Sequence, residues 1–157
     1  MNSWVYEKAE EYSEGWFTEI TPRLWQGGTR DSDMIDSSRY SSPASEREEF
    51  TAIVSLDFRS QPVGPGVKEY RYGFVDGPIS LANIKHILEI ADWAYEQWQI
   101  GEKVLIRCQA GANRSGLITA LVLMKDGLSA DEAIKLIQSK RSFALSNSDF
   151  NDWLRKI

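Results

Sequence analysis

Cysteine and histidine are almost missing from this sequence, which contains one of each among 157 residues. A single cysteine excludes an intramolecular disulfide framework, so we expect a reducing, cytoplasmic location. Protein zinc sites draw most of their ligands from Cys and His, so we expect no zinc cluster. If Cys108 were oxidised, no second cysteine in the chain could resolve it.

Excess basic charge and long apolar runs are missing too. The sequence has 18 basic and 23 acidic residues, a formal net charge of −5. This balance gives no electrostatic footprint for nucleic acid or for an anionic membrane. No apolar stretch reaches the roughly 20 residues of a membrane span, and the first residues lack the pattern of a signal peptide. We expect neither nucleic acid nor membrane as a partner, and the oligomeric state stays open.

What is present is a composition typical of a globular protein, with 42% hydrophobic and 26% charged residues. The length fits one domain with a sizeable core, so we predict a single domain over residues 1–157. Within it, residues 29–49 are polar and lack apolar periodicity. We interpret them as a polar insertion that is either a lid or docking element or an inert loop.

The chain is organised around residues 107–116, which read Arg-Cys-Gln-Ala-Gly-Ala-Asn-Arg-Ser-Gly. The apolar run before them, at 103–106, predicts a buried strand, and the run after them, at 117–124, predicts a buried helix. A loop between a strand and a helix N-terminus favours anion binding. Its backbone N–H groups can point inward, and the helix end adds partial positive charge.

The polar side chains of this loop suit phosphate chemistry. A thiol at a helix N-terminus beside a guanidinium ionises more readily than free cysteine, so we expect Cys108 to be a thiolate nucleophile. Arg114 can bind two phosphate oxygens at once, and Ser115 can donate a hydrogen bond to the departing sulfur. The alternative is that Cys108 is an ordinary buried cysteine, which the small and polar residues after it disfavour.

The pattern C-x5-R-S resembles the phosphate-binding loop of the cysteine-dependent protein tyrosine phosphatase superfamily, and in particular of its dual-specificity branch. Residues 20–27 also resemble the opening hairpin of that branch. Arg141, Asn147 and Phe150 resemble its C-terminal pattern, and we interpret these three as scaffold.

The resemblance implies a protein phosphatase that hydrolyses phosphotyrosine through a phosphocysteine intermediate and needs no metal or cofactor. Phosphoserine and phosphothreonine stay open as further substrates, because the depth of the site decides between them. The resemblance also implies a substrate-binding loop made of these residues: Gln109, Ala110, Gly111, Ala112, Asn113 and Arg114.

A departing alkoxide or phenoxide leaves more easily when a general acid protonates it. Asp57 and Asp76 both follow predicted strands. Asp76 lies 32 residues before Cys108 (108 − 76 = 32), and residues 75–78 are similar to the mobile acid loop of dual-specificity phosphatases. The resemblance therefore implies that Asp76 is the general acid, and later the base toward water. Asp57 remains the alternative acid, and a plain Asp-Gly turn remains the alternative role of Asp76.

One residue departs from the family, which usually has His before the cysteine where this chain has Arg107. Arg107 either supports the thiolate with its charge or points to an acidic neighbour and plays no part. It is the one feature that favours a catalytically weak pseudophosphatase that only binds phosphate. A phosphatase for a non-protein phosphoester is a further alternative, which the uncharged interior of the loop, 109–113, disfavours.

The strands alternate with helices along the chain. Strands are predicted at 51–56 and 69–75, and helices at 81–98, after Ser129 and at 147–157. This order predicts an α/β domain with a small, largely parallel central sheet flanked by helices, as in dual-specificity phosphatases. The predicted inward residues of the helix after Ser80 are Ile84, Ile87, Leu88, Ala91, Ala94, Tyr95 and Trp98. Those of the last helix are Phe150, Trp153, Leu154 and Ile157.

Overall fold

The computed structural model describes residues 15–29 and 50–157, and this part of the chain contains one five-stranded sheet. Its strands are β1 (Phe17–Thr21), β2 (Leu24–Gly27), β3 (Ala52–Ser55), β4 (Lys68–Arg71) and β5 (Val104–Arg107). They lie in the order β1-β2-β5-β3-β4, in which β1 pairs antiparallel with β2 and every other neighbouring pair is parallel. The predicted small, largely parallel sheet is confirmed.

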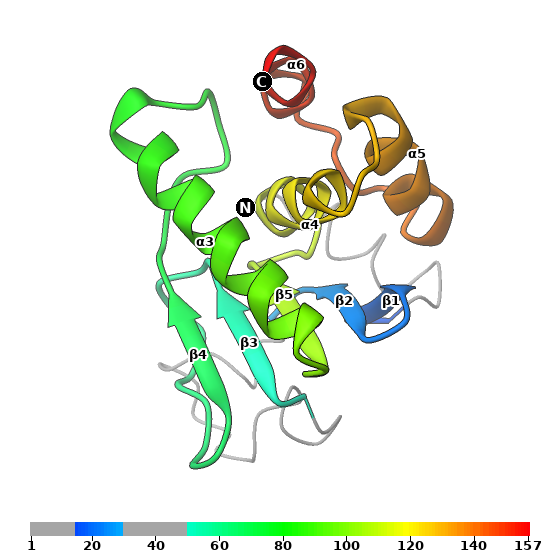
Figure 1. Ribbon diagram of the computed structural model, residues 1–157. Helices are drawn as coiled ribbons and strands as arrows, with labels where there is room; N and C mark the ends of the chain where they lie inside the picture. Colours follow the sequence, from blue (N-terminus) through cyan, green and yellow to red (C-terminus); the bar gives the residue numbers. More distant parts are fainter. Residues whose placement is uncertain (1–14, 30–49) are drawn as a thin grey trace.

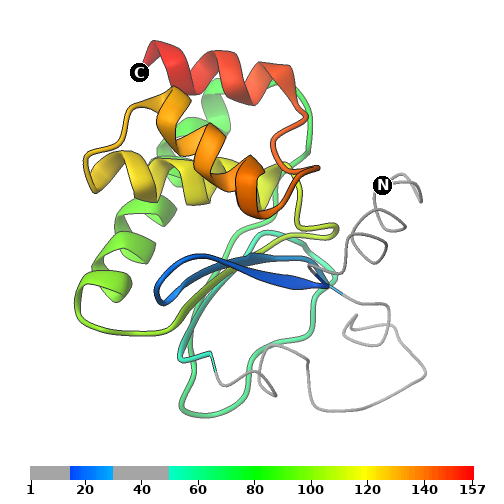
Figure 2. The same ribbon diagram turned by 90° about the vertical axis from the view of Figure 1, so that its right-hand side faces the viewer.

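The helices of the described chain gather on one side of this sheet (Figures 1 and 2). They are α3 (Leu81–Gln99), α4 (Arg114–Lys125), α5 (Ala130–Lys140) and α6 (Ser148–Lys156). α4 contacts the sheet as well as the three other helices, and residues 114–123 are buried. The prediction of a buried central helix after the cysteine is confirmed. None of the described helices is both long enough and apolar enough to span a bilayer.

Side chains of β5 alternate between the two faces of the sheet, as a strand requires. Val104 and Ile106 belong to the main core under the helices, and Cys108 continues that row. Leu105 faces the other side, where it packs with Phe50 in a small second cluster. This alternation places the side chains of residues 107 and 108 on opposite faces, although the two residues are adjacent in sequence.

The buried face of α3 is narrower than the periodicity predicted. It consists of Ile87, Ile90, Ala91, Ala94 and Trp98. Ile90 belongs to it although it was not predicted. Leu88 is 39% exposed because it lies one residue round the helix from the stripe that faces the sheet. Ile157, which follows the end of α6, is likewise exposed rather than buried.

One strand boundary and one helix cap also differ from the prediction. The strand expected at 69–75 ends at Arg71, because its partner β3 ends at Ser55 and the last ladder bond runs from Tyr72 N to Ser55 O, at 2.9 Å. Ser80 does occupy the N-cap of α3, but its side chain makes no capping hydrogen bond. The predicted helix after Ser129 is confirmed as α5, and it begins with a capping box formed by Ser129 and Glu132.

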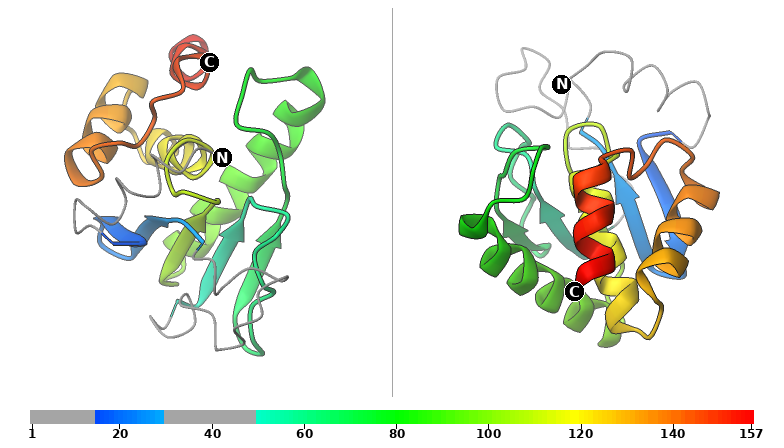
Figure 3. Two further views of the ribbon diagram at one scale, coloured as in Figure 1. Left: turned by 180° about the vertical axis from the view of Figure 1, so that it is seen from behind. Right: turned by 90° about the horizontal axis from the view of Figure 1, so that it is seen from above.

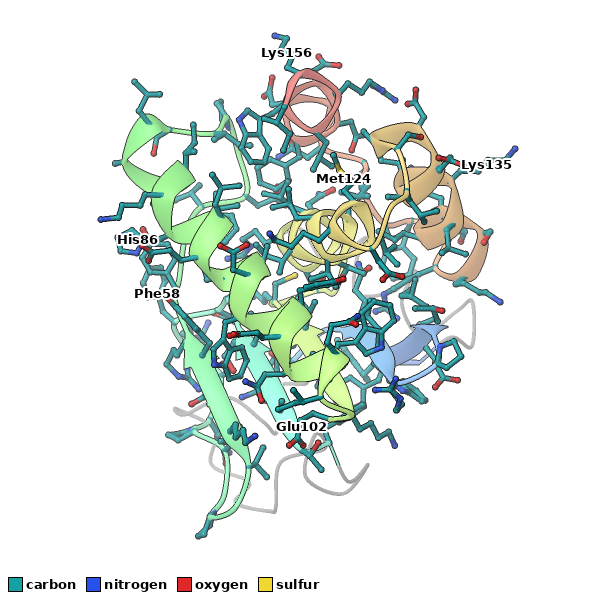
Figure 4. All side chains as sticks on the ribbon, in the orientation of Figure 1. Phe58, His86, Glu102, Met124, Lys135 and Lys156 are labelled. Carbon is teal, nitrogen blue, oxygen red and sulfur yellow. The ribbon has the colours of Figure 1, made fainter. Side chains whose placement is uncertain are left out.

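His86 lies off the buried face of α3, as predicted, and projects at the outer edge of the molecule (Figure 4). Its ring stacks on Tyr72 with the centroids 4.5 Å apart. Local packing therefore accounts for this histidine.

Candidate active site

The loop 108–113 joins β5 to the N-terminus of α4, which is the strand–loop–helix layout that the sequence predicted. Seen from above, it lies between the segment that leads into α3 and the segment that leads into α6 (Figure 3, right). Because β2, β3 and β5 are parallel, the residues that follow them meet at this same edge of the sheet. Parallel sheets commonly bind ligands there.

The outer side of the loop is held by two buried polar side chains that donate hydrogen bonds to its carbonyl oxygens. Arg141 donates from Nε to Gly111 O at 2.7 Å and from Nη2 to Ala110 O at 3.3 Å. Gln26 donates from Nε2 to Gly111 O at 3.0 Å and to Ala112 O at 3.3 Å. Both side chains are fully buried, so these carbonyl groups are fixed in an outward orientation.

Thr29 binds the first two carbonyl groups of the loop. Its hydroxyl donates to Cys108 O at 3.0 Å, and its backbone N–H donates to Gln109 O at 2.8 Å. Thr29, the first residue of the predicted polar insertion, is buried. The rest of that predicted insertion, 30–49, lies outside the described residues.

The outward carbonyl groups leave the inner side of the loop to backbone N–H groups. Within the part of the chain that the structure describes, none of the N–H groups of residues 109–113 donates a hydrogen bond to another residue. Buried N–H groups rarely go without an acceptor. A ring of unpaired N–H groups at a helix N-terminus is a concave site for an anion.

Gly111 allows the end of β2 to approach the loop closely. Its φ is +73°, and a Cβ atom there would lie 2.6 Å from Gly27 C and 2.7 Å from Gly28 N. Only glycine combines this backbone conformation with this approach at little cost.

Cys108 and Ser115 lie together at the base of the loop. The distance from Cys108 Sγ to Ser115 Oγ is 3.3 Å, and both residues are buried. When the sulfur is a thiolate, the serine hydroxyl must be the donor of this hydrogen bond. The cysteine therefore touches both the apolar core and the polar loop.

Arg114 lies beside them, and its guanidinium is only partly used by the protein. Nη1 donates to Phe74 O at 3.0 Å. Nε is buried and has no partner among the described residues. An unpaired buried donor is costly unless a ligand supplies the acceptor.

Asp76 lies at the rim of the loop rather than in a free turn. Asn113 Nδ2 donates to its Oδ2 at 3.0 Å, and Asn147 Nδ2 donates to its Oδ1 at 2.9 Å. Asp57 instead closes a local turn, since its Oδ1 accepts from Arg59 N at 3.1 Å. The structure thus brings Asp76 to the loop and gives Asp57 a structural partner; the acid role of Asp76 stays a prediction.

Arg107 points away from the loop, to the face of the sheet opposite Cys108. Its Nε donates to Ser55 Oγ at 3.0 Å and its Nη2 donates to Gln61 O at 2.8 Å. Glu69 Oε2 lies 3.6 Å from the same Nη2. Of the two alternatives for this residue, the structure has the one in which it points to an acidic neighbour.

Sequence reasoning missed the groups that shape the loop from outside. Of these residues, Gln26 was the most recognisable in the sequence, because it is a polar residue at an inward position of a strand. Arg141 and Asn147 were interpreted as scaffold, and their contacts with the loop bridge at least thirty residues of chain.

Comparisons with known proteins agree with this geometry. The family model described as dual specificity phosphatase, catalytic domain, matches residues 80–157. A crystal structure of a mouse candidate dual specificity phosphatase complexed with zinc tungstate is 26% identical, with a TM-score of 0.74, over 90% of this chain and 85% of that one. The chain belongs to the cysteine-dependent protein tyrosine phosphatase superfamily and is dual-specificity-phosphatase-like. The structure of human DUSP28 supports this dual-specificity-like assignment at 25% identity and a TM-score of 0.69, covering 90% of this chain and 91% of that one.

A curated relative of this phosphatase-like chain comes from Invertebrate iridescent virus 6 and is named as a candidate tyrosine phosphatase, 123R. It is 29% identical over 77 residues, which are 48% of this chain and 54% of the relative. The matched part therefore spans about half the length of that relative. A structure of PTPMT1 in complex with PI(5)P, 21% identical with a TM-score of 0.69 over 90% of this chain and 93% of that one, shares the fold.

Proposed function

We propose that this protein hydrolyses phosphate monoesters, with phosphotyrosine in proteins as its main substrate, through a phosphocysteine intermediate. The observation that carries the proposal is the set of unpaired donors around Cys108: the N–H groups of residues 109–113 and the buried Nε of Arg114. These donors belong to the loop that follows Cys108 and to the first residue of α4. A phosphate group supplies the oxygens that they lack.

In the first step, the Cys108 thiolate attacks phosphorus, so that an S–P bond forms and the ester P–O bond breaks. The leaving oxygen takes the bonding electron pair, and Asp76 gives it a proton. The amides of 109–113 and the guanidinium of Arg114 hold the three equatorial oxygens, over which negative charge is spread in the transition state.

In the second step, water attacks the phosphocysteine while Asp76, now a carboxylate, accepts a proton from it. The new P–O bond replaces the S–P bond, and the sulfur leaves as a thiolate. The hydroxyl of Ser115, 3.3 Å from the sulfur, donates a hydrogen bond to that thiolate and makes it a better leaving group. Free phosphate and the starting enzyme result.

Hydrolysis of p-nitrophenyl phosphate by four proteins tests this mechanism. We expect Cys108→Ser to abolish turnover while it still binds tungstate, and Asp76→Ala to slow turnover by roughly 10²–10⁴-fold. Asp57→Asn is the matched control, since it keeps the turn and its oxygen acceptor and should leave the rate nearly unchanged. Loss of activity in Asp57→Asn with full activity in Asp76→Ala would transfer the acid role to Asp57.

The same experiment separates the alternatives. A wild-type protein that binds tungstate but never turns over would be a phosphate-binding pseudophosphatase. A phosphotyrosine peptide compared with a phosphothreonine peptide and a soluble phosphoinositide then identifies the substrate class. We expect the phosphotyrosine peptide to be preferred, because the loop interior is uncharged and the chain carries a net charge of −5, which disfavours a polyanionic headgroup.

A further inference from the structure

Asp76 is held by side-chain amides from two segments far apart in the sequence. Asn113 in the loop donates to one carboxylate oxygen at 3.0 Å, and Asn147 at the start of α6 donates to the other at 2.9 Å. Asp76 itself is exposed, so burial does not fix its position. Hydrogen bonds have to do so.

The two asparagines are also bonded to each other, and this fixes which way each amide points. Asn113 Oδ1 accepts from Asn147 N at 2.8 Å and from Ser146 Oγ at 3.3 Å. Asn147 Oδ1 accepts from the N–H groups of Asp149 and Phe150 at the start of α6. Because both oxygens bind donors, both NH₂ groups must face Asp76.

The segment around Asp76 is fastened on either side as well. Arg114 Nη1 binds Phe74 O at 3.0 Å, and Asn147 Nδ2 binds Gly77 O at 3.1 Å. Residues 74–77 are therefore tied at one end to Arg114, the first residue of α4, and at the other end to the start of α6. A carboxyl group placed in this way stays beside the loop without any change of backbone.

We propose that Asn113 and Asn147 are positioning residues that hold the Asp76 carboxyl group where it protonates the leaving oxygen. This inference rests on the proposed function. Each amide occupies one lone pair of one carboxylate oxygen, and the second lone pair remains available for the transferred proton. Orientation matters at this point, since a displacement of about 1 Å from the reactive geometry can cost 10²-fold in rate.

A purely structural role makes a different prediction. Asn147 caps α6 and Asn113 fastens residues 146–147, so their loss could simply loosen the loop. A looser loop would bind phosphate less well and slow the hydrolysis of every ester by a similar factor. A misplaced general acid instead slows hydrolysis most for those esters whose leaving group depends most on a proton.

The test is kcat/KM for aryl phosphates that range from p-nitrophenyl phosphate, with a good leaving group, to phenyl phosphate, with a poor one. Asn147→Ser keeps a good N-cap for α6 but removes the amide donor. Asn113→Ser removes the amide donor of the loop, where the Asn113 side chain makes no capping hydrogen bond. We expect each to lower kcat/KM about 10–100-fold for phenyl phosphate and by a clearly smaller factor for p-nitrophenyl phosphate. Asp76→Asn should show the same trend with larger factors.

Two controls distinguish positioning from structure. Asn151→Ser removes an amide of α6 that binds Leu145 O and not Asp76, and it should leave the leaving-group dependence unchanged. In the Asp76→Asn background, the substitutions at 113 and 147 should have no further effect on phenyl phosphate, because the group that they position is gone.

An equal loss of kcat/KM across the whole series, or full additivity with Asp76→Asn, would overturn the positioning role and leave the phosphatase proposal intact. A wild-type protein inactive toward every ester would overturn both. Comparable unfolding midpoints in urea for wild type and Asn147→Ser show that the comparison concerns folded enzymes; if Asn113→Ser does not fold, Asn147→Ser alone decides the question.

Discussion

The two sides of the loop 108–113 are built in different ways. Its outer side is gripped by Arg141, Gln26 and Thr29, all of them buried, which bind carbonyl oxygens. Its rim is lined by Asp76, which is exposed, and by Asn113 and Asn147, which are half-buried. Both sides depend on hydrogen bonds, but only the rim exchanges them readily with water.

The buried outer side therefore maintains the shape of the site, and the exposed rim serves its chemistry. Removing a buried donor leaves an acceptor without a partner, which costs about 1–3 kcal/mol, whereas an exposed acceptor finds water instead. Substitutions on the outer side should therefore lower the free energy of unfolding and anion binding together. Substitutions at the rim should leave stability nearly intact and change rates selectively.

The largest effect should come from Arg141→Met. This change leaves the buried carbonyl oxygen of Ala110 without its donor, weakens the binding of Gly111 O, and removes the hydrogen bond to Thr18 Oγ1 at 2.7 Å. At about 1–3 kcal/mol for each group, we expect a loss of roughly 3–5 kcal/mol in the free energy of unfolding. Urea denaturation measures it, and tungstate binding should weaken in parallel.

Arg155→Met is the matched control, because Arg155 is an exposed arginine whose Nε binds Asp131 Oδ1 at 2.8 Å. Its effect should be far smaller. Equal losses at the two positions would mean that burial does not distinguish the outer side of the loop.

Gly111→Ala should have the next largest effect. The new methyl group would meet backbone atoms of residues 27 and 28 at 2.6–2.7 Å and would occupy a residue with φ of +73°. The left-handed conformation costs about 1–2 kcal/mol and the overpacking about 1–3 kcal/mol. We expect a loss of stability of about 3 kcal/mol by urea denaturation, together with loss of phosphatase activity.

Gly127→Ala separates these two costs. Gly127 has φ of +110° after the end of α4, but a Cβ atom there meets nothing within 4 Å. The control should therefore show the backbone cost alone and keep full activity. A loss as large as that of Gly111→Ala would show that crowding between β2 and the loop is unimportant.

Gln26→Met should have a smaller effect than either. It removes the donors to Gly111 O and Ala112 O, but Arg141 still binds the first and Leu145 N still binds the second. It also removes the Oε1 atom of Gln26, which is buried without a partner. We expect a loss of about 1 kcal/mol by urea denaturation. A loss as large as that of Arg141→Met would show that the remaining donors do not compensate for the loss of Gln26.

The sequence indicated the inner side of this loop better than the outer side. The strand–loop–helix layout and the identities of Cys108, Arg114 and Ser115 follow from local patterns, since all three lie within eight residues. The hydrogen bonds that Arg141 and Asn147 make to the loop depend on how distant helices pack against α4, and no local sequence pattern contains that information. The orientation of Arg107 could have been predicted from the sequence, because alternation along β5 places adjacent side chains on opposite faces of the sheet.

The smallest effect concerns a cap that touches neither side of the loop. At the start of α5, the backbone N–H of Ser129 donates to Glu132 Oε1 at 2.9 Å, and this bond and a second one from the Ser129 side chain hold the pKa of Glu132 below its ordinary value. Because the pKa is lowered in the folded state, the stabilisation is complete above the ordinary glutamate pKa and is lost as the pH falls through the lowered value. Glu132→Gln keeps the acceptor oxygen and removes the titration, so its unfolding midpoint should vary slightly less than that of wild type over this acidic range. Phosphatase activity at neutral pH should be the same for both proteins, because the capping box has no contact with residues 108–113. A change in activity would mean that the start of α5 helps to place Arg141, which follows the C-terminal end of the same helix.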